Sequence, residues 1–312
     1  MNIPHYWAKA EMEGRNRQGD VLPFVAWGSS DRNTDDARRQ AQHKVEALVA
    51  RFQSGEKLPH SGQNYYGGDR PLREEILQEF SSGDSPDAAI VTRNSYGCSV
   101  LNAARLMFID IDLPPGGKDA TVGDAIGLLG KIGRMLFSSA AKGPENHRPP
   151  EVAVELTPKE KSVLEKVRQW TNLHSNWGFR IYRTAGGLRV LATHDFFDPQ
   201  GSAASEVMNA LGADPMYIRL CRSQNCFRAR LSPKPWRVGV QSAFFRHPWV
   251  GTAKESAARD WLAHYQKACS QARTCQHLAD VGNGRIPQEF QSLVALHDEA
   301  TGANRLAPQK LA

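Results

Sequence analysis

The feature that most constrains the fold is an unbroken apolar segment, residues 105–111 (RLMFIDI), which is followed almost at once by Pro-Pro-Gly-Gly. A continuous apolar run of this length is typical of a strand buried on both faces, because a half-exposed strand would alternate apolar and polar side chains. The prolines and glycines then end the strand sharply. We therefore predict a buried strand that ends in a loop just after Asp112.

Composition places the chain among ordinary globular proteins. Its 312 residues are 40% hydrophobic and 23% charged, which suits about two domains of roughly 150 residues. No apolar run approaches the ~18 residues that span a bilayer, and the first residues lack the apolar stretch of a secretory signal. The five cysteines, an odd number, suggest reduced thiols. We expect a cytoplasmic protein with no membrane association.

Hydrophobic periodicity and turn residues predict a mixture of helices and antiparallel hairpins, which is an α+β fold. The first 30 residues are expected to be irregular or to form short strands. Helices are predicted at residues 35–54, 72–80, 121–138, 157–173 and 203–211, and an exposed linker at 140–150. Strands are predicted at residues 88–92, 105–111, 179–184, 188–193, 226–231 and 236–240. From about residue 254 the chain is expected to be helical, with a break at 280–287.

These elements suggest three parts. Residues 1–90 would form an N-terminal α+β part packed on the core, residues 91–250 the catalytic core, and residues 251–312 a helical C-terminal region. The core would be a mixed sheet with flanking helices.

Two acidic residues end the predicted buried strand. Asp110 and Asp112 are two positions apart, so their side chains point to the same face, roughly 6–7 Å apart along the strand. Carboxylates at this spacing repel each other unless they are solvated or bridged by a cation. A divalent metal with oxygen ligands, Mg²⁺ or Mn²⁺, is the bridge that this pattern favours; the alternative is two solvated aspartates at a strand end.

Positive charge is concentrated in one segment. Lys and Arg number 39 against 33 Asp and Glu, a net charge of +6. Residues 215–254 contain no acidic residue, and aromatic residues are interleaved with their arginines and lysines. Such a segment suits a polyanion, either nucleic acid or nucleotide phosphates. The alternatives are arginines that merely face water, or a surface that meets an acidic protein partner.

Several cations fall where they could line a site beside the acidic pair. In the hairpin 179–193, Gly186 and Gly187 allow a ligand to approach the backbone, and Arg189 follows the turn, where it could contact a phosphate. Arg228 and Arg230 share one face of the next strand, and Lys234 follows a Ser-Pro turn. We expect these cations to bind nucleotide phosphates.

In this order, the motifs resemble the archaeo-eukaryotic primase superfamily, the primase-polymerases, of which the chain would be a divergent bacterial member. The resemblance covers roughly residues 90–240. The strand Phe108-Ile109-Asp110-Ile111-Asp112 resembles that family's hhDhD strand, and Gly187-Leu188-Arg189 stands where the family has Gly-x-His. Asp214 would be the third acid, although Asp195 and Asp198 compete for that role. Residues 228–234 resemble an Arg-containing strand with a Pro, a turn and a Lys.

The resemblance implies a function and a set of partners. Asp110, Asp112 and Asp214 would hold Mg²⁺ or Mn²⁺ for nucleotidyl transfer from nucleoside triphosphates onto DNA or RNA. Arg189 would take the place of the histidine that contacts nucleotide phosphates, but a permanent cation cannot share that residue's titration. Two alternatives stay open: a metal-dependent nuclease that uses the same carboxylates, and a catalytically inactive primase-like protein that only binds nucleic acid.

Cysteine and histidine spacing raises two further hypotheses. Cys221 and Cys226 have a spacing that suits zinc, and Cys275 with His297 (or His277) could complete a structural zinc site. The alternative is that these thiols are small buried apolar groups. His194, beside Asp195 at a strand end, could be a general base or a ligand, or a hydrogen-bonded structural residue.

Overall fold

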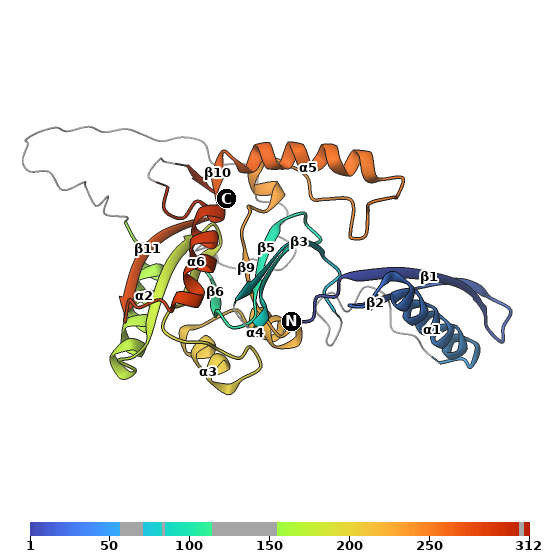
Figure 1. The fold of residues 1–312 in the computed structure, drawn as a ribbon, viewed down its shortest axis with the longest axis horizontal. Helices are drawn as coiled ribbons and strands as arrows, with labels where there is room; N and C mark the ends of the chain where they lie inside the picture. Colours follow the sequence, from blue (N-terminus) through green and yellow to red (C-terminus); the bar gives the residue numbers. More distant parts are fainter. Residues whose placement is uncertain (57–70, 83–84, 114–154, 306–308) are drawn as a thin grey trace, which may run out of the picture.

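The computed structural model describes residues 1–56, 71–82, 85–113, 155–305 and 309–312, and these form an α+β fold of helices and mainly antiparallel sheets (Figure 1). The predicted helix at 121–138 and the predicted linker at 140–150 lie outside the described residues. Within the described ranges, no helix is both long enough and apolar enough to cross a membrane.

A four-stranded antiparallel sheet, which we call the central sheet, contains the acidic strand. Its strand order is β11-β7-β8-β6, with β11 (Cys275–Gly282), β7 (Gly178–Thr184), β8 (Gly187–Ala192) and β6 (Phe108–Asp112). The predicted hairpin is confirmed: β7 and β8 are joined by the turn Ala185-Gly186. The predicted strand 105–111 is confirmed from Phe108 onward as β6, in which Phe108, Ile109 and Ile111 are buried, whereas residues 105–107 precede the strand.

Helices pack on this sheet and supply its core. The helices that contribute buried apolar side chains are α2 (Pro158–Leu173), α3 (Ser202–Leu211), α4 (Pro215–Gln224) and α6 (Gln288–Thr301). Helix α2 begins with the predicted capping box, in which the Thr157 side chain and the Glu160 side chain satisfy each other's backbone N–H groups. The start of α2 is therefore specified by two residues that are three positions apart in the sequence.

A second antiparallel sheet, with strand order β3-β4-β5-β9, meets the central sheet along β6 and β9. It contains β3 (Glu75–Ser82), β4 (Ser85–Arg93), β5 (Ser99–Ala103) and β9 (Phe227–Arg230). The buried hydroxyl of Tyr217, on α4, lies 2.8 Å from the Phe108 carbonyl oxygen and 3.0 Å from the Arg228 carbonyl oxygen. Because these carbonyls belong to β6 and β9, Tyr217 ties the two sheets together at the acidic strand.

The N-terminal residues form a unit with its own small core. Strands β1 (Tyr6–Arg15) and β2 (Val21–Ser30) pair along their full length, and α1 (Thr34–Gln53) covers one face of the hairpin. Ala10, Ala26, Ala41 and Val45 are buried between them. The unit projects from one end of the molecule (Figure 1). The prediction of helix α1 is close to its observed bounds, whereas strands β1 and β2 are longer and more regular than the sequence analysis predicted.

Three predicted elements are wrong. A helix was predicted at residues 72–80, where the structure has strand β3 from Glu75 onward, because pairing with β4 satisfies the backbone groups and the short apolar pattern fits both periods. Residues 235–238 form a 3₁₀ turn rather than a strand, started by Pro235 and ended by Gly239 with φ 78°. The C-terminal region is only partly helical: α5 (Glu255–Cys269) is followed by β11, which pairs with β7, and by the short strands β10 (Ala272–Arg273) and β12 (Lys310–Leu311).

The sheets also cross both predicted domain boundaries. The boundary at residue 90 falls inside β4, so it divides the second sheet, and β11 beyond residue 251 belongs to the central sheet. Long-range strand pairing, which local composition does not reveal, is the reason for the difference.

Candidate functional site

The acidic residues of β6 meet a third acid at the start of α4. Asp110 and Asp112 lie on the same face of β6, opposite Arg189 and Gly187 of β8. The backbone N–H of Asp214 donates to the Asp110 carbonyl oxygen at 3.1 Å, and the Asp214 side chain caps α4 by accepting from the Met216 N–H at 3.0 Å. The structure thus brings Asp214 to the pair. We call Asp110, Asp112 and Asp214 the acidic group.

The competing third acids lie elsewhere. Asp195 and Asp198 line a separate cavity of about 400 Å³ with Trp177 and His194. The Trp177 and His194 rings are 4.3 Å apart between centroids, and the His194 Nδ1 is buried without a hydrogen-bond partner. Burial lowers the pKa of His194. His194 therefore belongs to an aromatic cavity distinct from the acidic group.

The acidic group shows mutual repulsion at Asp112. Partial burial raises the pKa of Asp112, and the carboxylates of Asp214 and Asp110 raise it further, while the positive charges of Lys234 and Arg230 act in the opposite direction. A carboxylate crowded by two others in this way is a group to which a cation binds favourably.

Replacing Asp112 with asparagine is expected to stabilise the fold at neutral pH. The pKa of Asp112 is higher in the folded protein than in the unfolded chain, so the folded protein binds the Asp112 proton more tightly. The free energy of unfolding therefore falls as the pH rises from the unfolded-state pKa through the folded-state pKa. The variant avoids this loss. Denaturant unfolding should show a higher free energy of unfolding than wild type at pH 7 and no difference at about pH 3, below the ordinary carboxyl range. A less stable variant at pH 7 would show that attraction to the neighbouring cations outweighs the repulsion.

Arg189 is buried, and its guanidinium hydrogen-bonds to one member of the acidic group, Asp110. Only 1% of its surface is exposed. Its Nε donates to Asp110 Oδ1 at 2.8 Å and its Nη2 to Asp110 Oδ2 at 3.3 Å, while its Nη1 donates to the Arg230 carbonyl oxygen at 2.9 Å. The prediction that Arg189 binds a ligand phosphate is therefore corrected: the guanidinium positions Asp110 and joins the two sheets, and it does not face solvent.

Arg228 is also corrected as a phosphate ligand. Its Nη2 donates to both carboxylate oxygens of Glu74, at 2.8 and 2.9 Å, and both side chains are about nine-tenths buried. Glu74 also accepts from the Thr92 hydroxyl at 2.5 Å. The pair lies inside the second sheet. The alternation of side chains along β9 predicted that Arg228 and Arg230 share one face of the strand, but it could not predict that Glu74 would pair with Arg228.

Three other cations face the acidic group, and we call them the basic group: Arg230, Lys234 and Arg237. Burial lowers the pKa of Lys234, and the positive charges of Arg230 and Arg237 lower it further, which places the three cations within reach of one another. The Arg230 Nε and the Arg237 Nη1 are buried without a hydrogen-bond partner. Buried guanidinium N–H groups without acceptors are costly and favour an anionic ligand.

Arg237 is the functional candidate that sequence reasoning missed. A Cβ built on Gly186 would lie 3.3 Å from Arg237 Nη2 and 4.0 Å from Asp112 Oδ1. The glycine turn of the β7–β8 hairpin thus makes room for a guanidinium beside the acidic group, whereas the sequence suggested room for a ligand. The available signal was the acid-free segment that contains Arg237, which did not single out one arginine.

The predicted zinc ligands do not form a metal site. Cys275 Sγ lies 3.7 Å from Arg189 Nη1, and His297 Nε2 lies 3.3 Å from the same atom, so a guanidinium stands beside both side chains. His297 Nδ1 is 3.1 Å from Asp298. Burial raises the pKa of Cys221 to about 12 and that of Cys226 to about 11, and such thiols stay protonated and inert at neutral pH. Cys221 and Cys226 pack as small buried groups instead.

Across the part of the chain that the structure describes, no three or more His, Cys, Asp or Glu side chains surround a common metal position. In the acidic group, Asp112 and Asp214 carry the carboxylates not paired with Arg189, while each Asp110 oxygen already accepts from Arg189 and keeps one further lone pair. The carboxylates of Asp112 and Asp214 are therefore the donors left for a hard divalent cation, and Asp110 does not converge with them on a common metal position. No protein-family model, curated protein or solved structure matches this chain.

Proposed function

We propose that the protein catalyses divalent-metal-dependent nucleotidyl transfer on nucleic acid, as the resemblance of its motifs to primase-polymerases suggests. The observation that carries the proposal is the arrangement of the acidic group against the basic group. Asp112 interacts electrostatically with two carboxylates and with Arg230 and Lys234, and a guanidinium of the basic group approaches it at the β7–β8 turn. Carboxylates that suit a metal beside cations that suit phosphates are the elements that phosphoryl and nucleotidyl transfer require.

Each group has a distinct role in this proposal. Asp112 and Asp214, beside the Arg189-paired Asp110, would hold Mg²⁺ or Mn²⁺, which when bound neutralises phosphate charge and activates the attacking oxygen. Arg230, Lys234 and Arg237 would neutralise the phosphates of a nucleoside triphosphate, with the unpartnered Arg230 Nε and Arg237 Nη1 as donors. Arg189 keeps Asp110 oriented. DNA or RNA would occupy the basic surface supplied by residues 215–254.

A second candidate, a catalytically inactive protein that binds nucleic acid, is favoured by one observation. Arg189 donates two hydrogen bonds to the Asp110 carboxylate, so one carboxylate of the acidic group is already neutralised without a metal. A protein of this kind would retain affinity for nucleic acid when Asp112 is changed, and it would show no turnover with any metal.

Labelled-nucleotide incorporation on single-stranded and primed templates, with Mg²⁺ or Mn²⁺, tests the proposal. Asp112→Asn should lower the rate at least about 100-fold, the loss that follows removal of a group stabilising charge in a transition state, and it should leave the fold intact because Asp112 is exposed. The matched control is Asp195→Asn, an exposed aspartate in the separate cavity, which should keep the wild-type rate.

Three outcomes separate the candidates. Loss of incorporation in Asp112→Asn but not in Asp195→Asn supports nucleotidyl transfer. Strand cleavage without added nucleotides would identify a nuclease. Absence of both reactions in wild type, while nucleic acid and nucleotides still bind, would contradict catalysis and favour the binding protein.

A further inference from the structure

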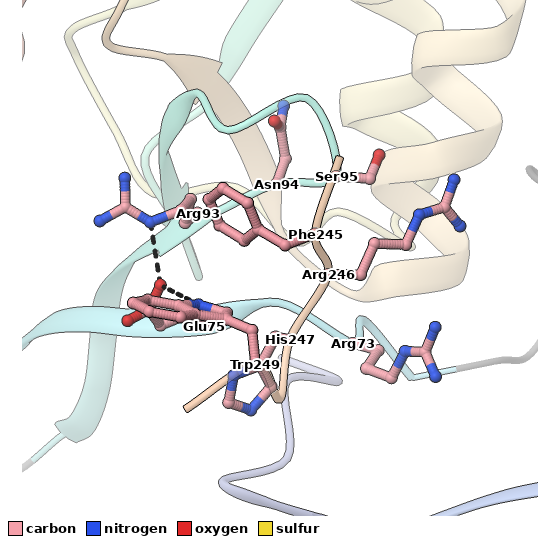
Figure 2. Close-up of a pocket in the computed structure, with 9 residues that line it drawn as sticks. All are labelled: Arg73, Glu75, Arg93, Asn94, Ser95, Phe245, Arg246, His247 and Trp249. Atoms are coloured by element: carbon pink, nitrogen blue, oxygen red, sulfur yellow. Dashed lines mark hydrogen bonds and ion pairs between the residues drawn. The ribbon is translucent and has the colours of Figure 1, made fainter. Parts of the chain in front are cut away.

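A second cluster of cations lies apart from the acidic group, where the N-terminal unit meets the second sheet. Figure 2 shows a pocket whose lining residues come from the start of β3, from the end of β4 with the residues after it, and from residues 245–249. Its interior holds only about 10 Å³, roughly the room of one water molecule. A ligand would therefore sit at the open mouth of the pocket, against the exposed side of its arginines, and a single compact group is what the mouth could hold.

The pocket has excess positive charge. Arg73, Arg93 and Arg246 line it together with a single carboxylate, that of Glu75. Glu75 Oε2 accepts from Arg93 Nε at 2.9 Å and from Trp249 Nε1 at 3.1 Å (Figure 2). The Glu75 carboxylate therefore forms its ion pair with Arg93. Among the residues that line the pocket, no other carboxylate is present to balance the charges of Arg73 and Arg246.

Arg73 is held in place but lacks an acceptor. Its guanidinium carbon lies 3.9 Å from the centre of the Trp27 ring, a cation–π contact that orients it. Its Nη1 is buried and has no hydrogen-bond partner. Burial and the charge of Arg246 lower the pKa of Arg73 to about 10, so it still carries its charge at neutral pH. In Figure 2 the Arg73 and Arg246 guanidinium groups point to the same side of the pocket.

We propose that this pocket binds one phosphate group, with Arg73 and Arg246 as its donors. Two arginines on one side of a small opening match the oxygens of a phosphate, because a guanidinium donates two parallel hydrogen bonds to such a group. The phosphate could come from a nucleic-acid strand, as a monoanionic phosphodiester, or from a free phosphate compound, as a monoanion or dianion, and both present tetrahedrally arranged phosphate oxygens. The site goes beyond the proposed function, since it needs neither the acidic group nor turnover.

Calorimetric titration with inorganic phosphate tests the site, with Arg246→Gln and Arg73→Gln as the variants. Each should weaken phosphate affinity at least about tenfold, because a hydrogen bond to a charged group contributes about 1.5–3 kcal/mol. Arg246 is exposed, so its replacement keeps the test valid if Arg73→Gln does not fold. The matched control is Arg259→Gln, which removes an equal charge near Trp249 from an arginine already paired with Glu255; it should bind phosphate as wild type does.

A short single-stranded oligonucleotide distinguishes the sources. If a strand supplies the phosphate, Arg246→Gln should reduce the slope of log affinity against log salt by about one, and Arg259→Gln should not. An unchanged slope with weakened inorganic phosphate binding would assign the site to a free phosphate compound. Equal phosphate affinity in wild type, Arg246→Gln and Arg259→Gln would overturn the proposal. The comparison of Arg246→Gln with Arg259→Gln changes neither the acidic group nor the basic group, so failure of nucleotidyl transfer does not affect this result.

Discussion

Asp110→Ala should lower the free energy of unfolding by about 3–5 kcal/mol, the cost of leaving a buried charge without its partner. Arg189 is 1% exposed and cannot reach water, and Asp110 is the carboxylate that receives two of its hydrogen bonds. The Arg230 carbonyl and His297 would remain as neutral acceptors, but neither compensates the charge. Denaturant unfolding followed by circular dichroism measures the loss.

Two further variants make this prediction specific. Asp112→Ala, two residues along the same strand face, should cost much less because Asp112 is exposed and repelled by its neighbours. Adding Arg189→Met to Asp110→Ala should recover much of the lost stability, since the uncompensated charge is then gone. Equal losses in Asp110→Ala and Asp112→Ala would show that the ion pair contributes little to the fold.

Glu74→Ala should cost a similar amount, about 3–5 kcal/mol, because it leaves Arg228 charged inside the second sheet. Both side chains of this pair are about nine-tenths buried, and the Thr92 hydroxyl would lose its acceptor as well. The matched control is Glu79→Ala in β3, the strand that begins just after Glu74; the Glu79 carboxylate is half exposed and pairs with His5, and an exposed pair contributes about 0–1 kcal/mol. Chemical denaturation measures both.

The same pair gives a test of the corrected assignment of Arg228. The double variant Glu74→Leu with Arg228→Met replaces a buried ion pair by apolar side chains, which is often neutral or stabilising. It should fold and bind nucleic acid as wild type does, whereas Arg230→Gln should weaken binding. Loss of binding in the double variant, with the fold intact, would return Arg228 to the phosphate-binding set.

Local signals in the sequence were sufficient for several elements. Helix α1 begins where the Asn33 side chain accepts from the Asp36 N–H, and α2 begins at the Thr157 capping box. The β7–β8 hairpin follows from its two-residue turn. In each case the stabilising hydrogen bonds join residues a few positions apart, so the pattern of neighbours is enough to predict the structure.

Strands whose partners are distant in the chain were not predictable in this way. The segment at residues 75–82 has short-range apolar spacing that fits a helix, and only its pairing with β4 makes it a strand. Strand β11 pairs with β7 across about a hundred residues of sequence, and a helical region was expected in its place. Pairing energy depends on the neighbouring strand, which local propensity does not specify.

The features of the candidate site also fall into those that local sequence predicts and those that long-range packing decides. The sequence by itself determined that Asp110 and Asp112 share one face of a buried strand, because a strand's two-residue period places them there. Only the tertiary structure decided which cations face these acids. Arg189 and Arg228 are neutralised by Asp110 and Glu74, 79 and 154 residues away. Arg228, Arg230 and Arg237 each keep one buried donor without a hydrogen-bond partner, so the carboxylate partner is what distinguishes Arg228 from the other two. The availability of an arginine for a ligand depends on which carboxylates the folded chain brings to it, and that is a property of long-range packing.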